Sequence, residues 1–332
     1  MSDTSPELSV VIPVFNEGAN VDMLVARLRP VLDGISPAWE VVFVDDGSRD
    51  DTLDRIRRLN KTDPRLRAVS FSRNFGKEIA IAAGLDHVRG RATVIMDADL
   101  QHPPEMIATF VQKWREGWAM VYGQRVDRGT DGPLRRWFTQ TFYRLFQAFG
   151  ETPLPEGAGD FRLLDRRAVE ALRQLGERAR FSKGLYAWIG FPSVGVPFAV
   201  AERAHGTSKF STRKLFRFAF DGITSFSTLP LKLWTYVGVG VSALSLAFAV
   251  YFVLRTAMSG VDVPGYASLI VAVTFLAGVQ LISLGVIGEY IGRIFAEVKR
   301  RPLYIVGDQI GFEEQVTALP AERPAGAERR RA

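Results

Sequence analysis

Two aspartates, Asp97 and Asp99, stand one residue apart directly after the short apolar run from Ala92 to Met96. The apolar run predicts a buried strand, and ligands of α/β sheets bind beyond the carboxyl ends of their strands. Two hard oxygen ligands at such a point suit Mg²⁺ or Mn²⁺, held with help from the phosphates of a substrate. The alternative is a polar turn that caps a helix starting near Pro103.

Acidic side chains also end two earlier strands. The run Leu8 to Val14 leads into P-V-F-N-E at 13–17, and Trp39 to Val44 leads into D-D-G-S at 45–48. We expect these carboxylates to accept hydrogen bonds from a nucleobase or from ribose hydroxyls, while Asp97 and Asp99 hold a metal over a diphosphate. The sequence contains no G-x-G-x-x-G after the first strand and no G-x-x-x-x-G-K-[ST], so a nucleotide must be held by carboxylates and a metal.

Basic residues with possible roles in phosphate binding follow the predicted sheet strands. Arg125 comes after the fifth strand, and Arg135 and Arg136 follow a loop rich in glycine and charge at 127–132. The guanidinium group matches the geometry of a phosphate, so the pair is a candidate clamp on an anionic acceptor. The alternative is a solvated helix face. The aromatic run from Trp137 to Phe149 is either core or a surface that dips into lipid.

Two further loops carry candidate site residues. In G-A-G-D-F-R at 157–162, small residues allow the backbone to approach a ligand, toward which Asp160 then projects. In R-A-H-G-T-S-K-F at 203–210, Arg203 and Lys209 are spaced to embrace a diphosphate.

Alternating apolar runs and amphipathic segments must position these residues. They predict a mostly parallel α/β sheet covered on both faces by helices. The expected strands are 8–14, 39–44, 66–71, 92–96 and 119–122, and the expected helices are 18–32, 50–60, 76–88 and 104–116.

The second half of the chain has the pattern of a membrane anchor. Residues 211–233 alternate basic and apolar side chains, as an interfacial helix does. The runs 235–254 and 263–288 carry no charge, and each is long enough to cross a bilayer core of about 30 Å. Basic residues flank the outer ends of the pair, so both ends are expected in the cytoplasm. The alternative is a hairpin buried in a soluble protein.

The amino-acid composition excludes several kinds of functional site. The chain has 332 residues, no cysteine, three histidines and a formal charge of +6. These counts exclude disulfides and zinc–thiolate sites and disfavour a histidine-rich metal site. The basic excess gathers after Arg203, which suits an anionic membrane surface better than nucleic acid. No apolar signal segment opens the sequence, so the first part is expected to fold in the cytoplasm.

The motifs P-V-F-N-E at 13–17, V-D-D-G-S at 44–48, S-R-N-F-G-K at 72–77 and D-A-D-L-Q-H-P-P at 97–104 resemble, in order and spacing, those of family 2 glycosyltransferases with a GT-A fold. The resemblance implies a nucleotide-sugar donor and Mg²⁺ or Mn²⁺. It further implies a nucleoside site and a diphosphate site, with Asp97, Asp99 and Gln101 as the metal ligands. The nucleoside site comprises Pro13, Phe15, Glu17, Val44 and Asp46, and the diphosphate site comprises Asp97, Ala98 and Asp99.

The later features resemble the polyprenyl-phosphate branch of that family. By this resemblance Arg125, Arg203 and Lys209 contact the donor or acceptor phosphate, and Asp160 faces the reacting centre together with Asp99. Phe15 stands where a tyrosine is common in the family and Phe210 where a tyrosine follows the lysine. The first change removes a hydroxyl and keeps a stacking surface.

The sequence therefore predicts inverting, metal-dependent transfer of a sugar to polyprenyl (undecaprenyl) phosphate. The protein is expected to be multi-pass in a bacterial inner membrane, with its catalytic domain in the cytoplasm and without a nucleic-acid partner. A UDP-linked donor is favoured, with glucose, N-acetylglucosamine, galactose or an amino-arabinose derivative as the sugar. A homo-oligomer is left open. The expected parts are a catalytic domain at 1–210, an amphipathic helix at 211–233, a transmembrane hairpin at 235–290, a cytoplasmic segment at 291–312 and a disordered tail at 313–332.

Two other functions fit the same motifs less well. A processive polysaccharide synthase of this fold carries Q-x-x-R-W and more spans, whereas the sequence around Arg135-Arg136-Trp137 lacks that glutamine. A catalytically inactive scaffold that still binds nucleotide is disfavoured because Asp97, Asp99 and Asp160 are all present.

Overall fold

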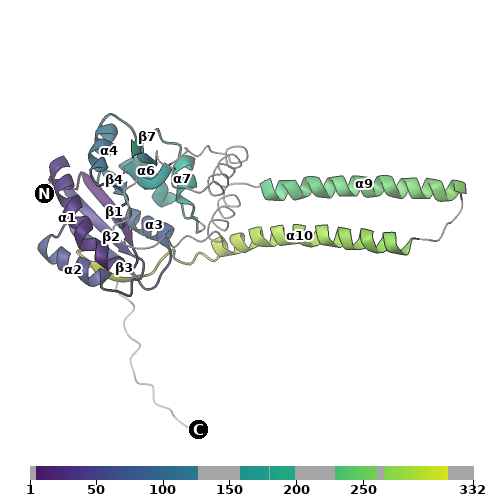
Figure 1. Ribbon diagram of the computed structural model, residues 1–332, viewed down its shortest axis with the longest axis horizontal. Helices are drawn as coiled ribbons and strands as arrows, with labels where there is room; N and C mark the ends of the chain where they lie inside the picture. Colours follow the sequence, from purple (N-terminus) through teal and green to yellow (C-terminus); the bar gives the residue numbers. More distant parts are fainter. Residues whose placement is uncertain (1–4, 126–157, 179, 199–228, 260–264, 313–332) are drawn as a thin grey trace, which may run out of the picture.

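The described strands form one sheet in the order β7-β5-β6-β4-β1-β2-β3-β8. The structure is a computed structural model that describes residues 5–125, 158–178, 180–198, 229–259 and 265–312 (Figure 1). Four strand pairs are parallel (β1/β2, β1/β4, β2/β3 and β5/β7) and three are antiparallel (β4/β6, β5/β6 and β3/β8). The prediction of a mostly parallel α/β sheet is confirmed.

The first half of the chain folds as its pattern predicts, because continuous Val/Ile runs alternate with amphipathic segments. The strands are β1 (Leu8–Val14), β2 (Trp39–Asp45), β3 (Leu66–Phe71), β4 (Ala92–Ile95) and β5 (Met120–Arg125). The helices between them are α1 (Gly18–Ile35), α2 (Thr52–Thr62), α3 (Lys77–His87) and α4 (Met106–Arg115).

Helices cover both faces of the sheet. On one face, residues of α1, α2 and α4 pack on apolar side chains of β1, β2 and β4. On the other face, α3, α6 (Arg166–Gln174) and α7 (Ser182–Trp188) form the second half of the core. Helix α6 begins directly after Asp165, whose carboxylate accepts a hydrogen bond of 3.0 Å from the Arg167 N–H.

Strand β6 (Ala158–Asp165) lies between β4 and β5 and is antiparallel to both. Strand β7 (Ser193–Phe198) pairs with β5. The sequence pattern did not predict either strand. The expected G-A-G-D-F-R loop at 157–162 is therefore largely strand, and this corrects the local assignment around Asp160.

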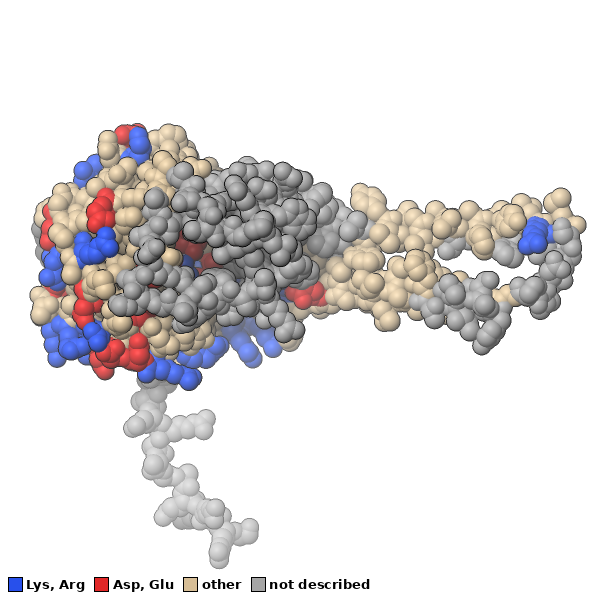
Figure 2. Space-filling model, in the orientation of Figure 1, with Lys and Arg blue, Asp and Glu red and all other residues tan. Residues whose placement is uncertain are grey.

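Two long helices, α9 (Leu229–Ser259) and α10 (Tyr266–Val298), lie side by side and project from the sheet domain (Figure 1). Where Figure 2 colours them, their surfaces are mostly uncharged, whereas Lys, Arg, Asp and Glu side chains are frequent on the visible face of the domain. Among the described residues, one stretch, Phe275–Val298, is long and apolar enough to cross a membrane. The second expected span stays a prediction. Residues 229–233 belong to α9, and the rest of the expected amphipathic helix lies outside the described residues.

After α10 the chain returns to the domain. Strand β8 (Val306–Ile310) pairs antiparallel with β3 at the edge of the sheet. Just before it, the Tyr304 ring stacks on Phe71 with centroids 5.0 Å apart, and the Tyr304 hydroxyl donates to Asp86 at 3.0 Å. The expected separation of 291–312 from a catalytic domain ending at 210 therefore needs correction, because 306–310 complete the same sheet.

Candidate active site

Two aspartates from neighbouring strands meet at the carboxyl edge of the sheet. Strand β6 runs antiparallel to β4 with Ile95 opposite Arg162 and Ala92 opposite Asp165. Continued by two residues, this register places Asp160 opposite Asp97. Side chains at opposed positions of an antiparallel pair point to the same face, so the two carboxylates come together although 63 positions separate them in the sequence.

Lys77 joins these two carboxylates. Its Nζ lies 2.6 Å from Asp97 Oδ1 and 2.9 Å from Asp160 Oδ2. Burial opposes the charge on Lys77, but the carboxylates of Asp160 and Asp97 outweigh it and raise the pKa of Lys77. Burial likewise opposes the charge on Asp160, yet Lys77 and Lys183 outweigh it and lower the pKa of Asp160. Asp160 is therefore a carboxylate at neutral pH.

A second layer of charged and polar groups lies beneath Asp160. The Arg162 guanidinium lies over the Tyr186 ring, 3.6 Å from its centroid, and donates to the Gly159 carbonyl at 2.6 Å. Burial lowers the pKa of Arg162 despite its carboxylate and phenol neighbours. Glu78 accepts hydrogen bonds from the hydroxyl and the N–H of Ser182 at the start of α7. The Arg162 contact ties α7 to β6, which carries Asp160, and the Glu78 contacts tie α7 to α3.

The turn after β4 is not a cap for helix α4. That helix begins at Met106 behind Glu105, and no side chain caps its first turn. Instead Asp99 Oδ1 accepts a hydrogen bond of 3.1 Å from the Gln101 N–H, and Leu100 takes the left-handed backbone conformation with φ of 61°. Such a φ is uncommon for a residue with a side chain. The turn holds Asp97 and Asp99 at the sheet edge, as the metal hypothesis requires.

His102 packs in the same turn as an aromatic side chain. Its ring stacks on Phe161 with centroids 4.8 Å apart, and its Nδ1 lies 3.4 Å from the Asp97 N–H. Burial lowers the pKa of His102, so the ring is neutral at physiological pH. It anchors the turn from the face opposite Lys77.

A cavity of about 460 Å³ opens where β1, β2 and β3 end. Of the five residues expected at the nucleoside site, Phe15 lines this cavity, and most of its other lining residues come from the same strand-end motifs. Its lining includes Phe15, Asn16, Ser48, Arg49, Arg73 and Asn74. An aromatic ring beside hydrogen-bonding groups suits a nucleobase and its sugar.

Not every expected nucleoside residue faces this cavity. Val44 has no exposed surface and packs in the core. Asp46 is 4% exposed, and its carboxylate accepts hydrogen bonds from the N–H groups of Phe75 at 2.6 Å and Gly76 at 2.9 Å. The Glu17 carboxylate accepts from the Asn20 amide at 2.6 Å. Asp46 therefore holds the backbone before α3 in place, and Glu17 pairs with a side chain of α1.

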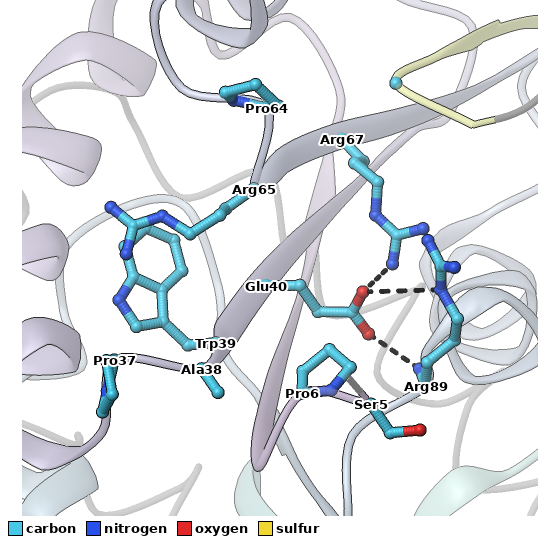
Figure 3. Close-up of a pocket in the computed structure, with 11 residues that line it drawn as sticks. Ser5, Pro6, Pro37, Ala38, Trp39, Glu40, Pro64, Arg65, Arg67 and Arg89 are labelled. Carbon is cyan, nitrogen blue, oxygen red and sulfur yellow. Dashed lines mark hydrogen bonds and ion pairs between the residues drawn. The ribbon is translucent and has the colours of Figure 1, made fainter. Parts of the chain in front are cut away.

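A larger cavity of about 530 Å³ lies at the opposite edge of the sheet, where β2 and β3 begin (Figure 3). Glu40 lies there between Arg67 and Arg89 and accepts hydrogen bonds from the Ser9 hydroxyl at 2.6 Å and the Arg89 N–H at 2.7 Å. These contacts join the loop before β4 to β2. The cavity is remote from Asp97 and Asp160.

The structure does not describe the side chains of several residues that are expected to bind phosphate. Arg135, Arg136, Arg203 and Lys209 lie outside the described residues, and only the backbone of Arg125, at the end of β5, is described. Their assigned contacts stay predictions.

Comparison with known proteins agrees with this fold and site. The family model for glycosyl transferase family 2 matches residues 9–173. An uncharacterized glycosyltransferase of Synechocystis is 50% identical over 317 residues, which are 96% of this chain and 98% of that protein. The chain belongs to glycosyl transferase family 2. It is a glycosyltransferase, and the family resemblance read from its motifs is confirmed.

Other relatives indicate which branch of the family this glycosyltransferase resembles. The model of the GtrB C-terminal hairpin matches residues 229–294. The SfII prophage-derived bactoprenol glucosyl transferase of Shigella flexneri is 44% identical over 300 residues, 90% of this chain and 97% of that protein. Among solved structures, the mannosyltransferase PcManGT of Pyrobaculum calidifontis has a TM-score of 0.46 at 21% identity and covers 84% of this chain and 83% of that one. The structural likeness is too slight to carry a conclusion about ligands.

The described side chains of this glycosyltransferase supply too few oxygen ligands to hold a divalent cation alone. They fit such a cation only together with the phosphates of a substrate. No group of three or more His, Asp or Glu side chains that could hold a metal occurs among the described residues. Asp97 and Asp99 supply carboxylates, Lys77 already places a cation against Asp97, and the buried Asp160 Oδ1 has no hydrogen-bond partner in the described part of the chain. This arrangement attracts cations, and Mg²⁺ commonly combines one or two carboxylates with substrate phosphates.

Sequence reasoning missed the groups around Asp160. Lys77 was part of the S-R-N-F-G-K motif, but nothing in the spacing showed that it reaches both Asp97 and Asp160. Arg162 and Tyr186 come together only through the pairing of β6 with β4 and the packing of α7. Polar and apolar residues alternate only from Asp160 to Leu163, which is too short a run to predict the strand.

Proposed function

We propose that this glycosyltransferase transfers a sugar from a nucleotide-sugar donor to a polyprenyl phosphate at the cytoplasmic face of a membrane. The observation that carries the proposal is the meeting of Asp97 and Asp160 at the carboxyl edge of the sheet, beside the cavity that Phe15 lines. Relatives named bactoprenol glucosyl transferases, matched over nearly their whole length, support the lipid acceptor.

The donor lies with its nucleoside in the cavity between Phe15 and Arg73 and its diphosphate at Asp97 and Asp99. These two aspartates, with Gln101, would hold Mg²⁺ or Mn²⁺, which would supply positive charge to offset that of the leaving nucleoside diphosphate. The names of the relatives favour glucose as the sugar, and we propose UDP as its carrier.

The acceptor needs no strong general base. The second pKa of a phosphate monoester is about 6, so a polyprenyl phosphate oxygen is anionic near neutral pH. It attacks the anomeric carbon in line with the departing diphosphate, and the configuration inverts. Asp160, kept anionic by Lys77 and Lys183, orients the acceptor or stabilises positive charge that develops on the sugar ring.

The two long helices place the acceptor phosphate near the site. We propose that α9 and α10 both cross the bilayer, so that the polyprenyl chain lies beside them and its phosphate at the interface. Large apolar side chains exposed along both helices, among them Phe248, Tyr251, Leu269 and Phe275, support this orientation.

Membranes that contain the protein test the proposal when they are offered a panel of labelled nucleotide sugars. We expect one labelled lipid with a single sugar per phosphate, lost with Asp99→Ala and with EDTA. Full activity in EDTA would exclude the metal, and a polymeric product would favour a processive synthase. Donor binding without transfer to any lipid would favour an inactive scaffold.

A further inference from the structure

Lys77 lies between the carboxylates of Asp97 and Asp160. The proposed function assigns different roles to these two groups. Its Nζ contacts Asp97 Oδ1, on the donor side, at 2.6 Å and Asp160 Oδ2, on the acceptor side, at 2.9 Å. Two carboxylates held this close repel each other unless a cation lies between them. The ammonium group thus holds together the two halves of the site.

The backbone that carries Lys77 is fixed from β2. The Asp46 carboxylate accepts hydrogen bonds from the N–H groups of Phe75 and Gly76, the two residues before Lys77. Gly47, with φ of 71°, lies so close to this loop that a Cβ there would come within 2.7 Å of the Arg73 carbonyl carbon. The start of α3 is therefore held firmly against the sheet.

The side chain of Lys77 is less constrained than its backbone. Averaged over the whole side chain it is 41% exposed, although its ammonium group is enclosed by the carboxylates of Asp97 and Asp160. Lysine is a point charge on a flexible stem. Its ammonium can leave Asp97 while the helix start remains in place.

We propose that Lys77 is a positioning residue that makes metal binding by this enzyme depend on the nucleotide. The inference rests on the proposed metal site at Asp97 and Asp99. A divalent cation that binds Asp97 must displace the ammonium and is repelled by it. An anionic diphosphate removes this conflict, because it ligates the metal and accepts a hydrogen bond from the displaced lysine. Metal and donor therefore bind with positive coupling.

Direct measurement of Mn²⁺ affinity tests the proposal without sugar or lipid. The purified full chain in detergent is titrated with Mn²⁺, and free Mn²⁺ is read by electron paramagnetic resonance, alone and with UDP or GDP. Without nucleotide, we expect Lys77→Met to bind Mn²⁺ about tenfold more tightly than the wild type, which corresponds to about 1.4 kcal/mol. Nucleotide should then strengthen Mn²⁺ binding by a larger factor in the wild type than in the variant.

Matched variants separate the effect of the Lys77 charge from a general loss of folded structure. Lys77→Arg keeps the charge and should behave as the wild type. Lys113→Met removes a lysine that pairs with Glu116 at 2.8 Å on α4, away from the site, and should leave Mn²⁺ affinity unchanged. If Lys77→Met does not fold, Lys77→Gln removes the charge while keeping a hydrogen-bond donor. Unchanged or weaker Mn²⁺ binding in the folded uncharged variant overturns the proposal, even when its melting temperature falls.

The same titration distinguishes this inference from the proposed function. If neither wild type nor variant binds Mn²⁺ with UDP or GDP, the metal assignment fails and the inference fails with it. If the wild type binds Mn²⁺ with nucleotide and transfers sugar, but Lys77→Met matches it in every titration, only the role of Lys77 is refuted.

Discussion

Glu78 lies beside the active-site charges without contacting either donor-side aspartate, and it makes a pH-dependent contribution to stability. Burial, with the Asp160 charge nearby, raises the pKa of Glu78 above its ordinary value of 4.5. The folded state then holds the proton more tightly than the unfolded state. The stabilising contribution of the protonated group is present below about pH 4.5 and is lost as the pH rises through the folded pKa.

Glu78→Gln removes this titration and keeps acceptors for the Ser182 hydroxyl and N–H. We expect the melting temperature of the variant to rise relative to that of the wild type as the pH increases from 4 to 8. Thermal melts of the two proteins across this range provide the measurement. A difference that stays constant with pH would contradict the assignment.

At the residue scale, variants of Arg135 and Arg136, which lie outside the described residues, can distinguish the acceptor site from the donor site. If Arg135 and Arg136 bind the lipid phosphate, losing one charge-assisted contact costs about 1.5–3 kcal/mol, roughly tenfold to a hundredfold in affinity. We expect Arg135→Ala or Arg136→Ala, made singly, to raise the KM for polyprenyl phosphate in at least one case.

Calorimetry without lipid supplies the control for that prediction. The Kd for the nucleotide sugar should stay within about twofold, since distant sites perturb each other little. Loss of donor binding with an unchanged lipid KM would place the arginines at the donor site.

At the scale of elements, α3 depends on close contact with the sheet, because it delivers Lys77 to the active site. A Cβ on Gly84 would come within 2.2 Å of Val11 Cγ1 in β1. Overpacking of this kind costs roughly 1–3 kcal/mol. We expect Gly84→Ala to lower the melting temperature and also the activity, since α3 must shift.

Gly34 in α1 offers the matched control, because no atom lies within 4 Å of the position of its Cβ. Gly34→Ala should stabilise the protein by about 0.5–1 kcal/mol, since alanine favours the helix more than glycine does. Thermal melts and transfer assays on both variants check the pair. Equal stability of the two would mean that α3 does not pack on β1 as described.

How well the sequence predicts a helix or strand depends on what stabilises that element. Strands β1 to β4 were predicted because apolar residues predominate in each of them, and all four are buried on both faces. Strand β8, with the sequence VGDQI, is largely polar and exposed, and its pairing with β3 bridges more than 230 positions. Strand β6 carries Asp160 and Arg162, whose charges are stable in the interior only beside Lys77 and Tyr186. No local pattern reports such partners, so the site was predicted at Asp97 and Asp99 and missed at Lys77.

At the scale of the whole molecule, the orientation of the helix pair is open to a direct test. The sequence contains no cysteine, so a single introduced thiol reports without background. Ser259 ends α9 at the tip farthest from the sheet domain (Figure 1). We expect Ser259→Cys to react with an impermeant thiol reagent added outside intact cells. Arg58→Cys, exposed on α2, should react only after the cells are broken. The reverse pattern would show the opposite orientation.

Strand β8 also sets the order in which the molecule can be completed during synthesis. Residues 306–310 leave the ribosome after both long helices, so the edge of β3 has no partner strand until α9 and α10 have been made. An unpaired edge strand is prone to associate with other chains. The sheet domain is therefore finished last although it begins first, and each newly made enzyme closes its sheet only after both helices of the pair have been synthesised.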